Sequence, residues 1–544
     1  MSKNQKIFDR IETVLFLVLT LLNLLPVLLV KYFPTVDGPA HLYNARLMAE
    51  LLHKPSSLIN QYFTIENLVP TNLTDHYFFL LTGYFLPGFL SEKLLMLFYL
   101  AGLPYAYRYF IRSIKPEGIY LSYFIFPFTY SFMFFYGFFN FHIAIVILLL
   151  SLAHLKKFYN HPSVLNSITF LILTMMVCLS HVFVFMILLL YLIIFYHREI
   201  ILLLSDKPAE MKKSVIKKLS IVAFIIAPSL LLIIISSIRS QPLDLQNDYM
   251  SISQHLKWIR QIQPAKGIVY QREDIYTTWL FYLLVLMTIV TIYNIFIAGL
   301  SYAKGRISFT INKDKNYKPD NILLVISLVI LAIYFILPDG FRGSSFVSSR
   351  LLVFFFLFFI AWIASGHMQF WIKVTAILVI IVMNTFLLSI YIHESKKLNY
   401  SACELEKAAE FITPNSTVLP INQSGKWIYG HFSNYLGINK PMVILENYEA
   451  ELDYFPISWN IKRMPRMLFG EADSLSPCLK WKSQPANAPQ TVEYVLLINN
   501  LDSNNDFCNS KINEILNKYY TSVFKSENNE IELYGLGLEN DRNQ

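Results

Sequence analysis

An aspartate and a histidine directly after the first apolar run are the residues most suited to chemistry. Asp37 and His41 follow the apolar run 12–32 and are separated by four positions. If a helix begins near Pro39, this spacing places both side chains on one face. A carboxylate there can bind a divalent cation such as magnesium or manganese, or accept a proton as a general base, with His41 as an auxiliary ligand. The alternative is that Asp37 caps the helix through its side-chain oxygen.

A second acid and histidine stand at the other end of the same polar segment. Asp75 and His76 precede a short apolar stretch, residues 76–90, that ends in Pro-Gly. Asp75 can serve as the N-cap of a helix there. If the segment folds back, either side chain can join Asp37 and His41 around one pocket.

Several polar residues fall inside or at the ends of apolar runs, where such residues are costly and often functional. They are Asn140, His142 and His181. Each histidine can instead simply bond a neighbouring carbonyl. Arg342 and Arg350 lie where a later apolar run begins, and we assign them to a phosphate group because arginine binds phosphate bidentately. The alternative is an interfacial anchor whose charge reaches the lipid headgroups.

The composition indicates a membrane protein. Hydrophobic residues make up 55% of the 544 and charged residues only 15%, compared with roughly 25% charged in soluble domains. Nothing in the distribution of the basic residues indicates nucleic-acid binding. Apolar runs long enough to cross a bilayer predict about eleven spans. The runs are 12–32, 93–112, 118–136, 139–155, 165–181, 182–197, 219–238, 276–300, 321–337, 350–366 and 370–392.

The basic residues predict the orientation. If 76–90 is interfacial or re-entrant rather than a span, the basic groups at 3–10, 108–115, 156–157, 198–218 and 304–318 all fall on one side. The positive-inside rule makes that side cytoplasmic. The amino terminus is then cytoplasmic, and everything after residue 393 is periplasmic or extracellular. We expect a multi-pass protein of a bacterial inner membrane.

The chain is expected to have two domains, a membrane domain at 1–393 and a soluble domain at 394–544. The soluble part has a mixed pattern, and α/β and α+β folds both remain open. Helices are predicted at 402–412 and 510–520. Strands are predicted at 416–421, 441–445, 492–498 and 530–535. The segment around Asn447-Tyr448-Glu449 is expected to be a surface loop.

The order of these elements resembles the GT-C membrane glycosyltransferases, such as the lipid A aminoarabinose transferases and the protein O-mannosyltransferases. Asp37 matches the acid that opens their first outward loop, and residues 75–112 resemble their juxtamembrane helix and second span. The resemblance implies a polyprenyl-phosphate sugar donor that enters from the lipid bilayer. It also implies an acid that acts as base or metal ligand, and inversion at the sugar. Many members carry a second acid in the next outward loop, but here residues 136–140 contain none.

Two other functional classes stay open. A transporter or flippase for a lipid-linked molecule would need polar residues through the whole depth of the spans. In this sequence they gather near the outward ends. A non-catalytic membrane scaffold is the third reading, because the second carboxylate is missing. The sugar, the acceptor and the oligomeric state are not indicated by the sequence.

Overall fold

The computed structural model describes residues 3–53, 58–66, 71–205, 208–239, 248–303, 319–340, 345–452, 454–460, 492–499 and 507–537. The chain divides into two compact units. The helical unit contains residues 1–26, 97–134 and 139–392, and the mixed unit contains residues 27–96, 135–138 and 393–544. Four helices have residues in both units: α1 (Lys3–Leu28), α5 (Gly88–Ile114), α6 (Phe132–Tyr136) and α16 (Phe370–Glu410).

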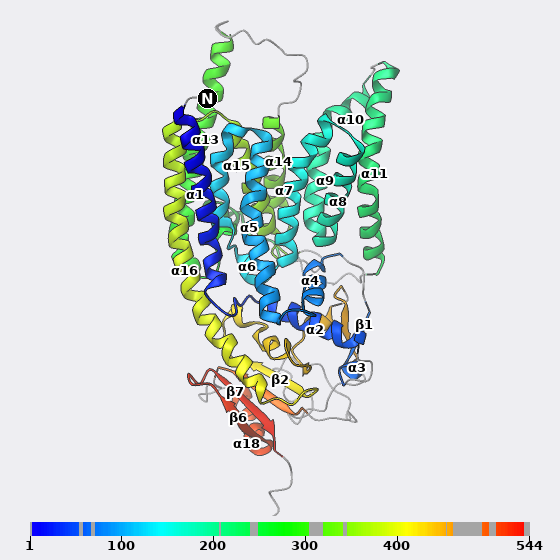
Figure 1. Cartoon of the computed structure of the whole chain (residues 1–544), viewed down its shortest axis with the longest axis vertical. Coiled ribbons are helices and arrows are strands. Elements are labelled where there is room, and N and C mark those ends of the chain that lie inside the picture. Colours follow the sequence, from blue (N-terminus) through cyan, green and yellow to red (C-terminus); the bar gives the residue numbers. More distant parts are fainter. Residues whose placement is uncertain are drawn as a thin grey trace, which may run out of the picture. The chain divides into compact units, whose positions relative to one another are not determined.

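The helical unit is built almost entirely from the apolar runs. Its further elements are η1 (Pro116–Phe128), α6 (Phe132–Tyr136), α7 (Phe139–Asn160), α8 (Val164–Ser180), α9 (Val182–Phe195), α10 (His197–Leu204), α11 (Ala209–Arg239), α12 (Ile252–Arg260), η2 (Gln263–Ala265), α13 (Tyr270–Ala303), α14 (Pro319–Ile336) and α15 (Val347–Ser365). Helix α15 is buried over nearly its whole length and packs against α14 and η1. It is therefore a central helix of this unit. Figure 1 shows the helices of this unit.

All eleven predicted runs are helical, but fewer meet the length of a full span. Among the described residues, eight helices are long and apolar enough to cross a membrane, and α9 with α10, bent by 54°, would make a ninth. Two predicted spans are shorter: α8 has 17 residues and the described apolar part of α14 is 322–336. The chain has the helices of a multi-pass membrane protein. The predicted number of eleven spans is larger than the eight or nine that are long and apolar enough among the described residues.

The predicted span 118–136 differs in kind, because most of it is the 3₁₀ helix η1. A 3₁₀ helix rises about 2.0 Å per residue, so its 13 residues extend about 26 Å. Gly118 allows η1 to approach α15 closely, since a Cβ there would lie 2.2 Å from the carbonyl oxygen of Ala364. Inside the unit, the Arg108 guanidinium forms two 2.6 Å bonds with the Glu12 carboxylate. This ion pair lowers the free-energy cost of burying the Arg108 and Glu12 charges.

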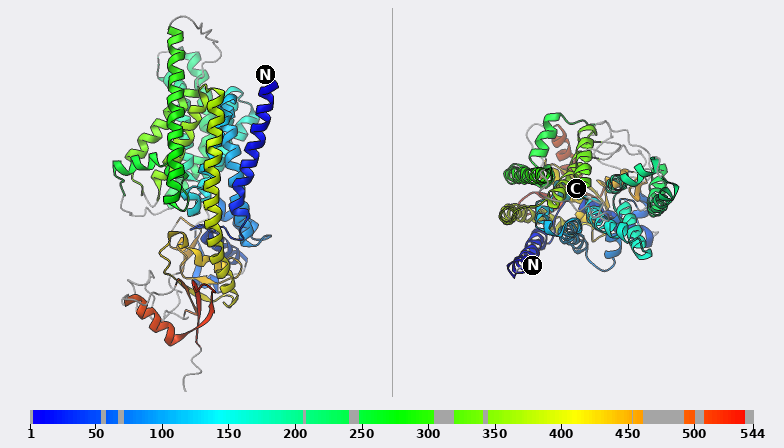
Figure 2. Two further views of the ribbon diagram at one scale, coloured as in Figure 1. Left: turned by 90° about the vertical axis from the view of Figure 1, so that its left-hand side faces the viewer. Right: turned by 90° about the horizontal axis from the view of Figure 1, so that it is seen from above.

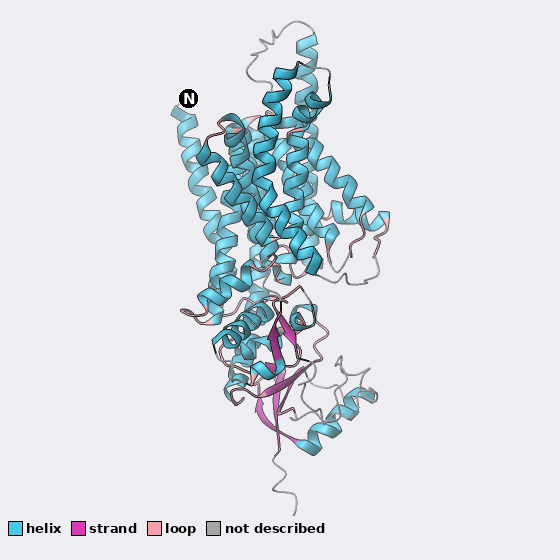
Figure 3. Cartoon of the chain, turned by 90° about the vertical axis from the view of Figure 1, so that its right-hand side faces the viewer, coloured by secondary structure: helices cyan, strands magenta, loops and turns pink. Residues whose placement is uncertain are grey.

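The mixed unit combines short helices with two sheets (Figure 2, Figure 3). Its first segment forms α2 (Gly38–His53), α3 (Ile59–Tyr62), β1 (Phe63–Ile65) and α4 (Thr74–Thr82). Its later segment forms β2 (Thr417–Asn422), η3 (Trp427–Tyr429), η4 (Phe432–Gly437), β3 (Val443–Ile444), η5 (Glu449–Glu451), β4 (Ile457–Trp459), β5 (Tyr494–Ile498), α18 (Phe507–Tyr519), β6 (Tyr520–Lys525) and β7 (Ile531–Leu536).

The larger sheet has the strand order β3-β2-β5-β7-β6. Strand β2 is parallel to β3 and β5, whereas β7 is antiparallel to β5 and β6. The sheet therefore contains both parallel and antiparallel strand pairs. It has features of both fold classes left open by the sequence, α/β and α+β. The four predicted strands are confirmed within two residues as β2, β3, β5 and β7, while β1, β4 and β6 were not predicted. Strands β1 and β4 pair residues 63–65 with residues 457–459, which joins the two segments of the unit.

Two predicted helices have different limits. The apolar stretch 76–90 is not one helix, because α4 ends at Thr82 and Gly88 already begins α5. Pro87 lies directly before α5, where its missing amide hydrogen costs no helical hydrogen bond. The predicted helix 402–412 is the end of α16, which runs unbroken for 41 residues and stops just before Thr413-Pro414.

Candidate functional site

Asp37 lies directly before α2 and is held by backbone bonds. Its amide donates to the carbonyl of Tyr136 at 2.9 Å, and its own carbonyl accepts from the His41 amide at 2.9 Å. The Gly38 amide is satisfied by Thr35 Oγ1 at 3.1 Å. A threonine, not the Asp37 carboxylate, therefore serves the first turn of α2, and the capping alternative is wrong for that amide.

Gly137 makes the close approach to Asp37 feasible. Its φ is +96°, and a Cβ there would lie 2.9 Å from the amide nitrogens of Asp37 and Gly38. Positive φ and lack of space both favour glycine. The loop that lacks the second acid thus contributes its backbone to the position of Asp37.

The Asp37 carboxylate faces a histidine from the later segment of the mixed unit. His431 Nε2 lies 3.7 Å from Asp37 Oδ1, and His431 Nδ1 lies 2.5 Å from Glu446 Oε1. Ser433 and Asn434 each donate to the other Glu446 oxygen at 2.8 Å. We call Asp37, His431 and Glu446 the Asp37 group. In it, an anchored carboxylate orients an imidazole toward a second carboxylate.

Burial decides the ionisation of this group. Asp37 is only 6% exposed, and burial raises its pKa to about 6, although His431 and His41 act in the opposite direction. Burial lowers the pKa of His431, but the Glu446 carboxylate outweighs it, so the net shift is upward. Asp37 is therefore an ionised carboxylate near neutral pH with a pKa suited to accepting a proton.

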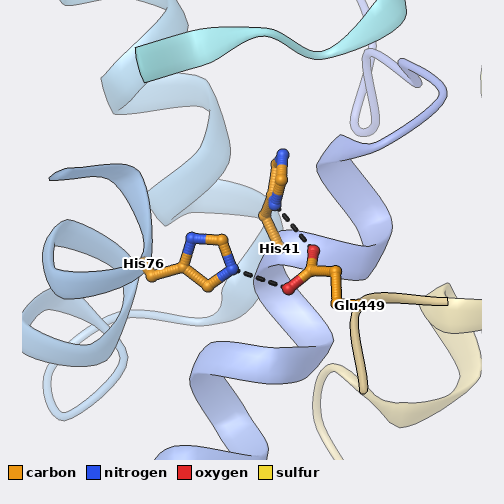
Figure 4. A group of neighbouring side chains, drawn as sticks. All are labelled: His41, His76 and Glu449. Atoms are coloured by element: carbon orange, nitrogen blue, oxygen red, sulfur yellow. Dashed lines mark hydrogen bonds and ion pairs between the residues drawn. The ribbon is translucent and has the colours of Figure 1, made fainter. Parts of the chain in front are cut away.

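A second group of ionisable side chains lies deeper in the mixed unit. We call His41, Asp75, His76 and Glu449 the His41 cluster. The Glu449 carboxylate lies between the two rings, with Oε1 2.7 Å from His41 Nδ1 and Oε2 2.7 Å from His76 Nε2 (Figure 4). Asp75 Oδ1 accepts from His76 Nδ1 at 2.8 Å, and Asp75 Oδ2 lies 3.7 Å from His41 Nε2. Three elements, α2, α4 and η5, meet at these four side chains.

The cluster is almost completely buried. Asp75, His76 and Glu449 are 0% exposed, and His41 is 6% exposed. Burial alone would lower the pKa of His76, but Glu449 and Asp75 raise it to about 10. Burial likewise opposes the charge on Glu449, yet the two histidines lower its pKa to about 2. The N-cap of α4 is Leu73, so the prediction that Asp75 is the N-cap is wrong. Asp75 lies inside the first turn, where its Oδ1 also accepts the His76 amide at 2.7 Å.

The segment that contributes Glu446 and Glu449 is buried rather than a surface loop. Asn447 and Glu449 are 1% and 0% exposed, so the predicted surface loop is wrong. Asn447 exchanges amide hydrogen bonds with Asn44 of α2 at 2.8 and 3.0 Å. The Tyr448 ring stacks on His431 with ring centres 4.1 Å apart. Two acids three positions apart, directly after a buried strand, are the sequence signal that would have identified this segment.

The remaining predicted site residues belong to the helical unit. His142 Nε2 lies 2.9 Å from Ser131 Oγ, a side-chain hydroxyl and not the carbonyl of the alternative. His181 packs on the Phe141 ring at 5.4 Å, and the Arg350 guanidinium lies 5.8 Å from the same ring centre. Asn140 is buried at the start of α7. Arg342 lies outside the described residues.

The His41 cluster also contains the ligand atoms best placed for a metal. Among the described residues, His41, His76 and Glu449 form a group whose ligand atoms all lie within 4.8 Å of one another. Asp37, the metal ligand expected from the sequence, is not a member of that group. Two imidazoles and a carboxylate are typical zinc ligands.

No protein-family model and no curated protein sequence matches this chain. A solved structure does: ArnT from Cupriavidus metallidurans, bound to undecaprenyl phosphate, is similar over 96% of this chain and 97% of its own. The TM-score is 0.54 and the sequence identity is 9%. At that identity the likeness concerns the fold alone, and it covers nearly the whole length of both chains. The protein thus has a fold similar to that of ArnT.

Proposed function

We propose that this chain is a membrane glycosyltransferase that moves a hexose or pentose from a polyprenyl-phosphate carrier to a hydroxyl group of a glycan, lipid or protein. The ArnT-like fold supports this function, because that structure was solved with undecaprenyl phosphate. The observation that carries the proposal is Asp37. Its carboxylate is buried, has a pKa of about 6 and is not spent on the first turn of α2.

In the proposed reaction, the acceptor hydroxyl oxygen forms a bond to the anomeric carbon while the bond from that carbon to the phosphate oxygen breaks. Asp37 takes the hydroxyl proton, and the polyprenyl phosphate leaves with the bonding electrons. Attack opposite to the leaving group inverts the anomeric carbon. His431 is a positioning residue, since it lies 3.7 Å from Asp37 and is itself fixed by Glu446.

The absence of a carboxylate in the second outward loop leaves the proposed base, Asp37, in place. In this chain residues 136–140 carry no carboxylate, but Tyr136 fixes Asp37 through its carbonyl. The mixed unit supplies other buried acids from its later segment, of which Glu446 reaches Asp37 through His431. We propose that this segment takes over the electrostatic role that the second loop has in related folds.

We further propose that Arg350 binds the donor phosphate. It begins α15, is 8% exposed and lies beside Phe141 together with His181. A guanidinium can bind a phosphate through two parallel hydrogen bonds. It would stabilise the charge on the phosphate as the bond to the sugar breaks.

The proposed location is the outer face of a bacterial inner membrane. The basic groups at 108–115 and 156–157 and in the other loops assigned to the cytoplasm support an orientation with the amino terminus inside. In this orientation the mixed unit, with the Asp37 group, is periplasmic or extracellular.

The proposal can be tested with the purified full-length protein in proteoliposomes. Undecaprenyl-phosphate hexoses and pentoses, each labelled in the sugar, are incubated with lipid and glycan fractions of a bacterial membrane. We expect label from one donor in an acceptor and free undecaprenyl phosphate. The Asp37→Asn variant should lower the transfer rate by about 10²- to 10⁴-fold, the usual effect of losing a positioned base.

Glu50→Gln is the matched control, because Glu50 is another buried acid on α2, 4% exposed and paired with Arg46 at 2.8 Å. It should keep most of the transfer activity. Unchanged transfer in Asp37→Asn would remove the proposed base. Label that crosses the bilayer still attached to its carrier would indicate a flippase, and donors that all stay intact and on one side would favour a scaffold.

A further inference from the structure

We propose that His41, His76 and Glu449 bind a zinc ion that joins α2, α4 and η5 of the mixed unit. This site is separate from the Asp37 group and does not depend on sugar transfer. It replaces the magnesium or manganese ion expected at Asp37 with a different metal on a different set of ligands.

The ligand geometry is close to what zinc requires. His41 Nδ1 and His76 Nε2 each lie 2.7 Å from an oxygen of the same carboxylate (Figure 4). Zinc binds nitrogen and oxygen at about 2.0–2.2 Å, which separates tetrahedral ligands by about 3.3 Å. The ligand atoms of the three residues all lie within 4.8 Å of one another, so adjustments of the side chains would bring them to this spacing.

The surroundings of His76 match those of a metal ligand. Asp75 Oδ1 accepts a bond from His76 Nδ1 at 2.8 Å, so the Nε2 atom is left to face Glu449. A carboxylate that holds the far nitrogen of an imidazole fixes its tautomer and orientation and strengthens it as a ligand. Asp75 is the neighbour in sequence of the residue it orients, and both are fully buried.

The charges also fit a divalent cation. The cluster contains two carboxylates, Asp75 and Glu449, at 0% exposure, and two imidazoles. One divalent cation held by two neutral imidazoles would balance the two negative charges of these carboxylates, so no buried charge would be left uncompensated. Nitrogen ligands favour zinc over magnesium, which prefers oxygen.

The ion would act as a cross-link. His41 and His76 come from the first segment of the mixed unit, and Glu449 comes more than 370 positions later in the chain. The same segments already meet at Asn44 and Asn447. A zinc ion at this position would hold together the two parts that present Asp37 and His431 to each other.

The test is the metal content of the full-length protein in detergent. The protein is stripped with a chelator, equilibrated with zinc sulfate, freed of unbound metal and measured by plasma mass spectrometry. We expect one zinc ion per chain in the wild type and none in His76→Asn. His431→Asn is the matched control, because it alters a histidine–carboxylate pair of the same unit outside the proposed site, and it should retain the ion.

Cobalt provides a second measurement that does not depend on a variant folding. The stripped wild type titrated with Co²⁺ should develop the strong visible absorption of a tetrahedral site, and zinc should abolish it. Two results would overturn the proposal: a reconstituted wild type with no stoichiometric zinc and no cobalt bands, or a monodisperse His76→Asn that keeps its zinc.

Discussion

The two histidine–carboxylate groups of the mixed unit have similar residues but different environments. In the Asp37 group the His431 side chain is 20% exposed and the Glu446 side chain 27%. In the His41 cluster, Asp75, His76 and Glu449 have no exposure. The more open group leaves one carboxylate, Asp37, with a raised pKa, whereas the buried cluster balances every charge internally. The difference indicates that the first group is suited to proton transfer and the second to holding the fold.

The largest effect that separates the two groups is expected at Asp37. Asp37→Asn removes the proton acceptor and should reduce transfer by about 10²- to 10⁴-fold, equivalent to about 3–5 kcal/mol of barrier. Because the carboxylate is not used by the first turn of α2, the unfolding midpoint should stay close to that of the wild type. Transfer assays measure the change in rate, and thermal unfolding in detergent measures the change in the unfolding midpoint. A large loss of stability would mean that Asp37 is structural.

Substitutions in the buried His41 cluster should mainly lower the stability of the protein. Glu449→Gln leaves two imidazoles beside a single carboxylate and should lower the free energy of unfolding by about 3–5 kcal/mol, as for other broken buried pairs. Glu446→Gln, at a partly exposed carboxylate, should cost less, about 1–3 kcal/mol. Denaturant unfolding in mixed micelles measures both. Equal costs would contradict the distinction between an open and a buried group.

The pH dependence of transfer sharpens the role of His431. Asp37 must be ionised to act as a base, and its pKa is raised from 3.8 to about 6. The rate should therefore fall about tenfold per pH unit below about 6 and level off above it. His431→Ala removes a group that lowers the pKa of Asp37, so the acidic limb should move to higher pH.

A merely structural His431 would lower the rate at all pH values without moving that limb. Rates of transfer between pH 5 and 9 distinguish the two outcomes. Arg46→Ala, on the helix that follows Asp37 but in neither group, is a suitable control whose limb should stay near that of the wild type.

The smallest effect is expected where α2 begins. Thr35→Ala removes the hydroxyl that accepts from the Gly38 amide and should cost about 1 kcal/mol of stability. Thr35→Ser keeps the hydroxyl and should restore most of it. Because the backbone bond from Asp37 to Tyr136 remains, transfer should change little. A large loss of transfer in the alanine variant would show that the cap positions Asp37.

Much of the architecture could be predicted from local patterns. Each apolar run became a helix because a chain in a nonpolar environment must satisfy its backbone hydrogen bonds within the segment. Alternation and turn residues located β2, β5 and β7. The predictions were wrong where local sequence is ambiguous: the 3₁₀ helix η1, the break between α4 and α5, and the continuation of α16 past the apolar run to Glu410.

By itself, the sequence determined that the chain is a multi-pass helical protein and that Asp37, His41, Asp75 and His76 are residues to examine. Only the tertiary structure decided which of them meet and which partners they share. Glu446, Glu449 and His431 lie about 400 positions from Asp37, and no local pattern records such a separation. Burial, which raises the pKa of Asp37 and makes the charges of the His41 cluster depend on one another, is a property of the folded chain.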